Sequence, residues 1–199
     1  YPTKNYNIRT IARGIDFNFF DPNNVKAQQV ELIIKEFNID YDAIKILLAG
    51  RITGWKGHKL LLQAISTIIK KTNHKFEIIF VGPDENYKLK NSLKNFANEH
   101  NLSKSLHFVG SRTDLNNFYS LADLVISAST DPEAFGRISV EAQAMGKFVI
   151  ASNHGGSVET VKDGETGYLF ENNNSEDLCR KIIDAISNEK HKSNKTSEA

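Results

Sequence analysis

The chain has 199 residues, of which 40% are hydrophobic, and its formal net charge is +1. This length accommodates one well-packed domain but not two of ordinary size. The near-neutral charge and the scattered lysines exclude the basic surface of a nucleic-acid-binding protein, so we expect one domain and no nucleic-acid partner.

Apolar runs alternate with helical patterns from residue 45 onward, after a first helix expected at residues 23–39. This alternation is typical of β-α-β units. It predicts an α/β domain over residues 23–188, with a doubly wound, Rossmann-like parallel sheet of about six strands and helices on both faces, followed by a polar tail at 189–199. The predicted strands are 45–49, 76–81, 106–109, 124–128, 148–151 and 167–170, and the predicted helices are 57–71, 85–99, 114–121, 137–145, 157–161 and 175–187.

The polar motifs of the chain each follow a predicted strand. Ligands of open parallel sheets bind beyond the carboxyl ends of the strands, so these motifs are expected to meet on one rim. No segment reads G-x-G-x-x-G after a strand or G-x-x-x-x-G-K-[ST]. Neither a dinucleotide site of the Rossmann type nor a P-loop therefore has residue support.

The most informative motif is a pair of carboxylates, Glu133 and Glu141, with seven residues between them. Asp131-Pro132 and Gly136 place Glu133 on a turn, whereas Glu141 lies about one turn into a helix that begins near Arg137. The N-terminus of such a helix presents unpaired backbone N–H groups and about half a positive charge, so it favours a phosphate. Two hydroxyl-binding carboxylates beside a phosphate site predict a binding site for a sugar nucleotide.

In this pair the chain resembles the retaining glycosyltransferases of family four, which have the GT-B fold and a Glu-x7-Glu motif. Further similar motifs follow in the family's order over roughly residues 8–188. They are Gly14-Ile15-Asp16 and Phe20-Asp21-Pro22 in the segment that joins two domains, Gly50-Arg51 to Lys56-Gly57 at the diphosphate, Val109-Gly110 at the base, and Gly155-Gly156-Ser157-Val158-Glu159 with Asp163-Gly164-Glu165-Thr166-Gly167 after the second glutamate. The resemblance implies that residues 1–22 end an interdomain linker and that 23–188 form the C-terminal, donor-binding domain.

The resemblance also implies roles for the residues around the two glutamates. Glu141 is expected to accept hydrogen bonds from the ribose hydroxyls, and Glu133 to bind the transferred sugar as a catalytic residue. The Phe135 and Gly136 amides are expected close to sugar and phosphate, with Arg137 in the same donor-binding set. In one alternative Glu133 only stabilises the helix dipole, by ~0.3 to 1 kcal/mol. In another the pair is the acid and base of a hydrolase, which is disfavoured because these acids flank a helix N-terminus.

Two cations, Arg51 and Lys56, follow the first predicted strand. Negative charge develops on the leaving phosphate when a glycosidic bond to a nucleotide breaks, and a guanidinium fork and an ammonium can both bind phosphate oxygens. We therefore expect both to act in catalysis, the alternative being a pair of solvated surface cations. Trp55 between them is interpreted as loop packing.

Two glycines, Gly155 and Gly156, open a short predicted helix. Because glycine has no Cβ, a phosphate or sugar can approach its backbone closely, which makes both residues candidates for donor binding. The alternative is a tight turn that needs positive φ. His154, just before them, either binds a phosphate or hydroxyl or is solvated.

Base recognition is expected after the third strand, at Gly110 and Arg112. Arg112 can stack on or hydrogen-bond a base. Asp114 either pairs with guanine or, as we favour, caps the following helix.

The resemblance implies a hexosyltransferase that uses a UDP- or GDP-sugar and retains the anomeric configuration, in the synthesis of lipopolysaccharide or another cell-surface polysaccharide. The glycan or lipid-linked acceptor would be held mainly by a second, N-terminal half, so this chain alone is expected to be inactive. A glycogen- or starch-synthase-like glucosyltransferase and a non-catalytic nucleotide-sugar-binding module are the alternatives. No His/Cys/carboxylate cluster has metal-ligand spacing, so no metal or other cofactor is expected.

Cysteine usage and hydropathy bear on the compartment. The single cysteine, Cys179, can form no internal disulfide, which is typical of a reducing compartment. No stretch reaches the ~18 apolar residues that a spanning helix needs, and the chain begins with Tyr1-Pro2, so we expect its natural N-terminus to lie further upstream. A cytoplasmic location is expected, and peripheral association with the inner face of the membrane stays open.

Overall fold

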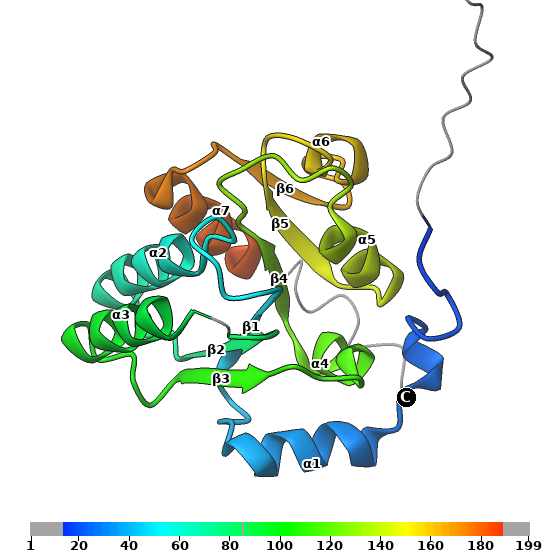
Figure 1. Cartoon of the computed structure of the whole chain (residues 1–199), viewed down its shortest axis with the longest axis horizontal. Coiled ribbons are helices and arrows are strands. Elements are labelled where there is room, and N and C mark those ends of the chain that lie inside the picture. Colours follow the sequence, from blue (N-terminus) through cyan, green and yellow to red (C-terminus); the bar gives the residue numbers. More distant parts are fainter. Residues whose placement is uncertain (1–13, 85, 189–199) are drawn as a thin grey trace, which may run out of the picture.

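A six-stranded parallel sheet in the order β3-β2-β1-β4-β5-β6 forms the centre of the molecule (Figure 1). The computed structural model describes residues 14–84 and 86–188. The strands are β1 (Ile44–Ala49), β2 (Phe76–Val81), β3 (Leu106–Gly110), β4 (Leu124–Ser127), β5 (Phe148–Ser152) and β6 (Gly167–Phe170). The α-helices are α1 (Ala27–Phe37), α2 (His58–Lys71), α3 (Tyr87–Glu99), α4 (Leu115–Leu121), α5 (Arg137–Ala144), α6 (Ser157–Thr160) and α7 (Ser175–Ser187). The predicted doubly wound α/β fold is confirmed.

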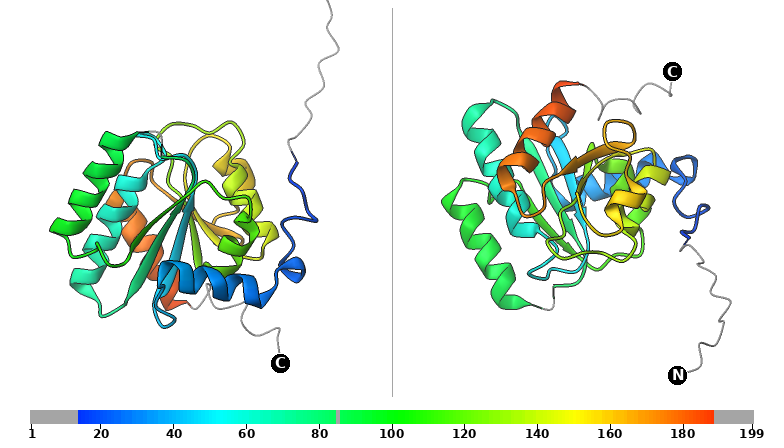
Figure 2. Two further views of the ribbon diagram at one scale, coloured as in Figure 1. Left: turned by 60° about the horizontal axis from the view of Figure 1, so that its bottom comes forward. Right: turned by 90° about the horizontal axis from the view of Figure 1, so that it is seen from above.

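Two hydrophobic cores form because successive side chains of a strand point to opposite faces of the sheet. In β1, Ile46 and Leu48 face a core shared with α2, α3 and α7, whereas Leu47 and Ala49 face one shared with α1, α4 and α5. Figure 2 shows the two helical layers on either side of the sheet. The strands read as continuous apolar runs because both faces are covered.

One predicted helix, at residues 23–39, is wrong in its extent. The chain first forms the short 3-10 helix η1 (Pro22–Asn24), which Asp21 caps, and α1 begins only at Ala27. Val25 and Lys26 between them are extended, with φ of −89° and −87°. Asn38 ends α1 in the left-handed conformation, at φ 51°. The other predicted elements agree with the structure to within about two residues at each end.

Part of the predicted domain layout cannot be compared with the structure. The predicted tail at 189–199 and residues 1–13 of the predicted linker lie outside the described residues. Within the remaining linker segment, Phe20 is buried in the core beside α1 and α4, with its ring 5.8 Å from that of Tyr119. Among the helices described, none combines the length and the apolar character required to cross a bilayer.

Candidate nucleotide-sugar site

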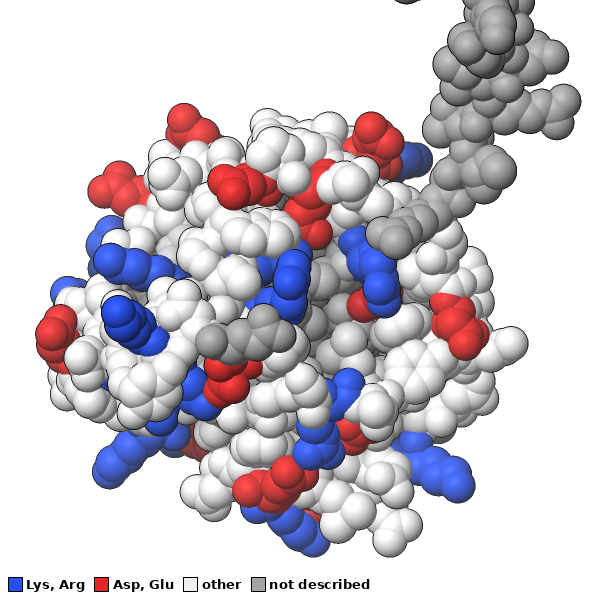
Figure 3. Space-filling view, viewed as in Figure 1, with Lys and Arg blue, Asp and Glu red and all other residues white. Residues whose placement is uncertain are grey.

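A cavity of about 490 Å³ opens beyond the carboxyl ends of β1, β2, β3 and β4. The strand order reverses between β1 and β4, and ligands of open α/β sheets bind at such a point. Figure 3 shows a hollow with basic side chains on either side near the centre of this face. The lining residues are Ala49, Gly50, Arg51, Trp55, Lys56, Val81, Gly82, Pro83, Ser111, Arg112, Leu115, Glu133, Ala134, Phe135, Gly136, Arg137, Ile138 and Glu141. Eight predicted site residues therefore meet in one place, from segments up to 90 positions apart.

Helix α5 begins at the wall of this cavity. Its N-cap is Gly136, at φ 72°, and no side chain caps the helix. Gly136, Arg137 and Ile138 line the cavity, so the uncapped first turn of α5 faces it. Such a turn carries unpaired N–H groups and a partial positive charge, which suit an anionic group.

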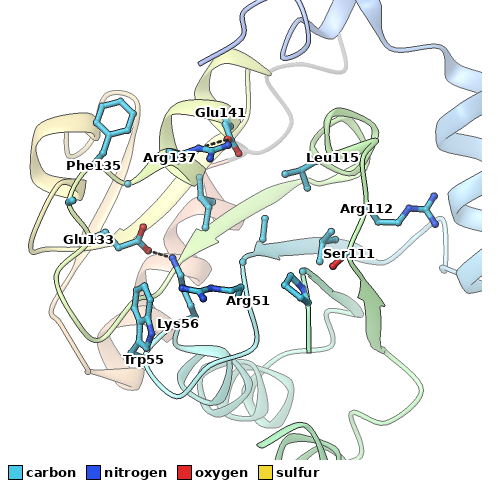
Figure 4. Close-up of a pocket in the computed structure, with 18 residues that line it drawn as sticks. Arg51, Trp55, Lys56, Ser111, Arg112, Leu115, Glu133, Phe135, Arg137 and Glu141 are labelled. Carbon is cyan, nitrogen blue, oxygen red and sulfur yellow. Dashed lines mark hydrogen bonds and ion pairs between the residues drawn. The ribbon is translucent and has the colours of Figure 1, made fainter. Parts of the chain in front are cut away.

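Glu133 and Lys56 form an ion pair across the cavity, with 2.7 Å between Lys56 Nζ and Glu133 Oε1 (Figure 4). Both side chains are only 12% exposed. The Ser129 hydroxyl also donates to Glu133 Oε1, and the Lys56 ammonium lies 4.4 Å from the centre of the Trp55 ring. Among the described residues no hydrogen bond engages Glu133 Oε2. The carboxylate is thus oriented by one oxygen while the other stays available to a hydroxyl donor.

Arg51 lies on the same rim with its side chain exposed. Within the part of the chain that the structure describes, no ion pair or hydrogen bond engages its guanidinium. A guanidinium fork without a protein partner at a cavity wall can bind a phosphate in bidentate geometry. The two predicted phosphate-binding cations are therefore together, but only Lys56 has a protein carboxylate as a partner.

Glu141 is buried, with 2% of its surface exposed, and lines the cavity from α5. Its Oε1 accepts hydrogen bonds from Arg137 Nε and Nη2, at 3.2 and 2.8 Å. Its Oε2 accepts one from the Tyr119 hydroxyl, at 2.9 Å. A buried carboxylate requires such compensation, and these contacts hold Glu141 as an acceptor at the cavity wall.

Arg112 reaches the cavity, yet its guanidinium points away from Lys56 toward α1 (Figure 4). Its Nε and Nη2 donate to the two carboxylate oxygens of Asp114, at 2.8 and 3.0 Å, and its Nη1 donates to Glu36, at 3.0 Å. The hydrogen bonds with Asp114 raise the pKa of Arg112 and lower the pKa of Asp114. Asp114 occupies the N-cap position of α4, as favoured, but its carboxylate binds Arg112 and makes no capping hydrogen bond to the helix. The base-binding role of Arg112 stays a prediction.

Three predicted donor-binding glycines are absent from the cavity lining: Gly110, Gly155 and Gly156. Gly155 and Gly156 instead pack against the loop that carries Glu133, with the Gly156 N–H donating to the Glu133 carbonyl at 2.6 Å. A Cβ at Gly155 or Gly156 would lie 2.7 or 2.6 Å from backbone atoms of that loop. Their small size is thus explained by support of the loop, and contact with a ligand stays a prediction.

His154 and Phe135 lie on the two chain segments that meet beside Glu133. The Nε2 atom of the half-buried His154 ring hydrogen-bonds the Ser129 carbonyl, at 2.7 Å, and contact of this ring with a phosphate or hydroxyl stays a prediction. The Phe135 side chain extends away from Lys56 and Glu133 (Figure 4), which leaves its backbone at the cavity wall.

Several residues of the site were missed in the sequence. Trp55 lines the cavity, although its pattern favoured loop packing, and Ser111 and Leu115 complete the wall near Arg112. Ser129 and Tyr119 do not line the cavity but each donates a hydrogen bond to one of the two glutamates. Ser129 lies four positions before Glu133, which is a weak signal, whereas no local pattern connects Tyr119 with Glu141.

The structure offers no evident set of metal ligands in the region it describes. Among residues 14–84 and 86–188, no group of three or more histidine, cysteine, aspartate and glutamate side chains could hold a metal ion. The cationic side chains at the cavity are those of Arg51, Lys56, Arg112 and Arg137.

The family described as "Glycosyl transferases group 1" matches residues 29–199. A lipopolysaccharide 1,2-N-acetylglucosaminetransferase of Salmonella typhimurium is 34% identical over 182 residues, which cover 87% of this chain and 48% of that protein. A glycosyltransferase of Rickettsia africae superposes with a TM-score of 0.83 at 36% identity, over 88% of this chain and 46% of the other. The HepE protein of Anabaena, solved in complex with UDP and glucose, superposes with a TM-score of 0.79 at 26% identity, over 89% of this chain and 47% of that protein. The chain thus spans about half the length of these relatives.

Proposed function

The chain belongs to the group 1 glycosyl transferases, and on that premise we propose that it binds the nucleoside-diphosphate sugar donor of a retaining hexosyltransferase. One observation carries the proposal: the cavity brings the Glu133–Lys56 pair, Glu141 and the uncapped start of α5 together. These groups match the parts of a sugar nucleotide, with cations for the diphosphate and carboxylates for hydroxyl groups. The relative solved with UDP and glucose supports this class of ligand.

Within the cavity the proposal assigns one part of the donor to each group. Lys56, Arg51 and the first turn of α5 neutralise the diphosphate, which gains negative charge as the glycosidic bond breaks. Glu133 Oε2 accepts a hydrogen bond from the transferred sugar, and Glu141 accepts from the ribose. The site therefore needs no metal ion to balance the leaving group, because its own cations and helix start supply positive charge.

The acceptor is proposed to bind mainly to residues outside this chain, since the chain spans 48% of the Salmonella relative. Catalysis then depends on holding donor and acceptor in reacting geometry, a contribution that can reach ~7 to 11 kcal/mol. We propose synthesis of lipopolysaccharide or another surface polysaccharide as the setting, because the Salmonella relative is a lipopolysaccharide transferase. An acceptor at a membrane would bring the whole enzyme to the inner face of the cytoplasmic membrane.

Titration calorimetry of this chain with UDP, GDP and ADP, each with and without a hexose, tests donor binding. One nucleotide is expected to bind in the micromolar to millimolar range, and its hexose conjugate more tightly. No binding to any of the six ligands would overturn the proposal.

Activity of the longer protein tests catalysis. The enzyme with its preceding half is expected to transfer the hexose, with the anomeric configuration of the product read by NMR, whereas this chain alone is expected not to. A full-length protein that binds donor but transfers to no acceptor would favour the non-catalytic module. Preferred transfer to α-glucan would favour a glycogen- or starch-synthase-like enzyme.

A further inference from the structure

Tyr119 is a fully buried tyrosine whose hydroxyl has one partner in the site. It lies on α4 with 0% of its surface exposed, inside the core formed with α1 and α5. Its hydroxyl donates to Glu141 Oε2 at 2.9 Å. Burial, followed by the charge of Glu141, raises the pKa of Tyr119 well above its ordinary value, so the hydroxyl keeps its proton and acts as a donor. A phenylalanine would fill the same core space, and among the described residues only Glu141 forms a hydrogen bond with the hydroxyl.

The two partners of Glu141 differ in how firmly they are held. The Arg137 side chain is 61% exposed, whereas that of Glu141 is 3% exposed, so of these two side chains only the arginine has room to move. Arg137 can therefore turn from Glu141 Oε1 to a phosphate when a ligand enters. Tyr119 cannot turn away, because its ring is enclosed by the core and meets the ring of Phe20 edge to face.

A carboxylate offers about four acceptor positions. Arg137 occupies Oε1 with two donors, and Tyr119 occupies one position of Oε2. When Arg137 leaves, the Tyr119 hydroxyl alone decides the rotation of the carboxylate about its last bond. The orientation of the two acceptors toward a pair of neighbouring hydroxyls thus depends on one buried hydrogen bond.

We propose that Tyr119 is a positioning residue for nucleotide recognition, which holds the Glu141 carboxylate in the orientation that accepts the ribose hydroxyls of the donor. The inference rests on the proposed function, since it requires that a nucleotide occupies the cavity. Tyr119 thereby controls, through Glu141, the discrimination between ribose and deoxyribose without contacting the ligand.

The test compares ribonucleotides with their 2′-deoxy analogues. Calorimetry with UDP and dUDP, or with GDP and dGDP, measures the affinity ratio in the wild-type chain and in Tyr119→Phe. The wild type is expected to bind the ribonucleotide about tenfold more tightly than its 2′-deoxy analogue. In Tyr119→Phe this affinity ratio is expected to fall about three- to tenfold. Tyr41→Phe is the matched control, because Tyr41 also donates to a glutamate, Glu31, at 2.6 Å but outside the cavity. Its ratio is expected to equal that of the wild type.

A lowered melting temperature of Tyr119→Phe with an unchanged ratio would show a structural role only and would overturn the inference. A second comparison, of Glu141→Ala with the double variant Glu141→Ala/Tyr119→Phe, is expected to give equal ratios, because the hydroxyl then has nothing to position. A further fall in the double variant would overturn the inference as well. Failure of the wild type to bind UDP, GDP or ADP would instead remove the proposed function, and this inference with it.

Discussion

Helices α2 and α5 begin alike but face different surroundings. Each starts after a strand, has a left-handed glycine as its N-cap, Gly57 at φ 77° and Gly136 at φ 72°, and lacks a side-chain cap. A Cβ on Gly57 would lie 1.9 Å from the Ala128 carbonyl oxygen, whereas one on Gly136 would meet its nearest neighbour at 3.4 Å. Gly136 lines the cavity and Gly57 does not. The same local signal therefore produces a packed helix start in one case and a ligand-facing one in the other.

The residues that follow the two glycines show the same difference. His58, the first residue of α2, is 2% exposed, packs edge to face on Phe80, and neither ring nitrogen has a hydrogen-bond partner among the described residues. Arg137, the first residue of α5, is exposed and charged. The Lys56–Glu133 ion pair joins the loops that lead into the two helices. A helix N-terminus is thus available to a ligand only where the surrounding chain leaves it open.

The largest expected effect comes from adding a methyl group at the start of α2, compared with the same change at the start of α5. Gly57→Ala is expected to lower the free energy of unfolding by roughly 3 to 5 kcal/mol, since the new Cβ overlaps the Ala128 backbone and the left-handed conformation is strained. Gly136→Ala has only the conformational cost, about 1 to 2 kcal/mol. Urea denaturation of both variants measures the difference. Equal losses would show that the two helix starts are packed alike.

The second largest effect is expected from His58, which should make the free energy of unfolding depend on pH. Burial, followed by the charge of Lys56, lowers the pKa of His58 from 6.5 to about 4. The unfolded chain then binds a proton that the folded chain does not, so the stabilisation is present above pH 6.5 and is lost as the pH falls toward 4. The shift corresponds to roughly 3 kcal/mol.

Denaturation of the wild type and of His58→Leu between pH 7 and 4 measures this contribution. The wild type is expected to lose stability more steeply over that range. His74→Leu, at an exposed histidine, is the control and is expected to follow the wild type. Parallel profiles for wild type and His58→Leu would contradict the assignment.

A smaller change is expected from the cation between the two helix starts. Lys56→Ala should weaken binding of UDP or GDP by about 1.5 to 3 kcal/mol and leave the affinity for the nucleoside nearly unchanged, because a charge-assisted contact to phosphate is lost. Lys35→Ala is the matched control, since Lys35 also pairs with a glutamate, at 3.2 Å, but on the exposed surface of α1. Calorimetry with each diphosphate and its nucleoside measures both affinities. An equal loss of affinity for both ligands would show that the substitution disturbs the fold.

The smallest effect is expected at Glu133. Glu133→Gln keeps the size of the side chain but replaces a charged acceptor, so the preference for the hexose-bearing donor over the bare diphosphate should fall by about 1 kcal/mol. Binding of the bare diphosphate should survive. Competition calorimetry with both ligands measures the preference, and a loss that is the same for both would contradict the assignment of Glu133 to the sugar.

Much of the site could be predicted because its residues lie in local patterns. Glu133, Gly136 and Glu141 belong to one loop-helix segment, and Arg51 and Lys56 to one loop after β1, so their spacing and the resemblance to a family indicate them together. The partners of these residues could not be predicted in the same way. Arg112 binds Glu36 from α1, 76 positions away, and this contact depends on how α1 lies against α4.

The amino-acid sequence alone predicts the strands and helices along the chain and the rim of the sheet to which the motifs belong. Apolar alternation and turn residues act within about ten positions, and the parallel connection of the strands places every loop after a strand on the same edge. The sequence does not predict which helix start is open, which glycines serve packing, or which hydroxyl holds Glu141. These features depend on the close packing of side chains from distant segments, which leaves a Cβ 1.9 Å from its nearest neighbour at Gly57 and 3.4 Å at Gly136.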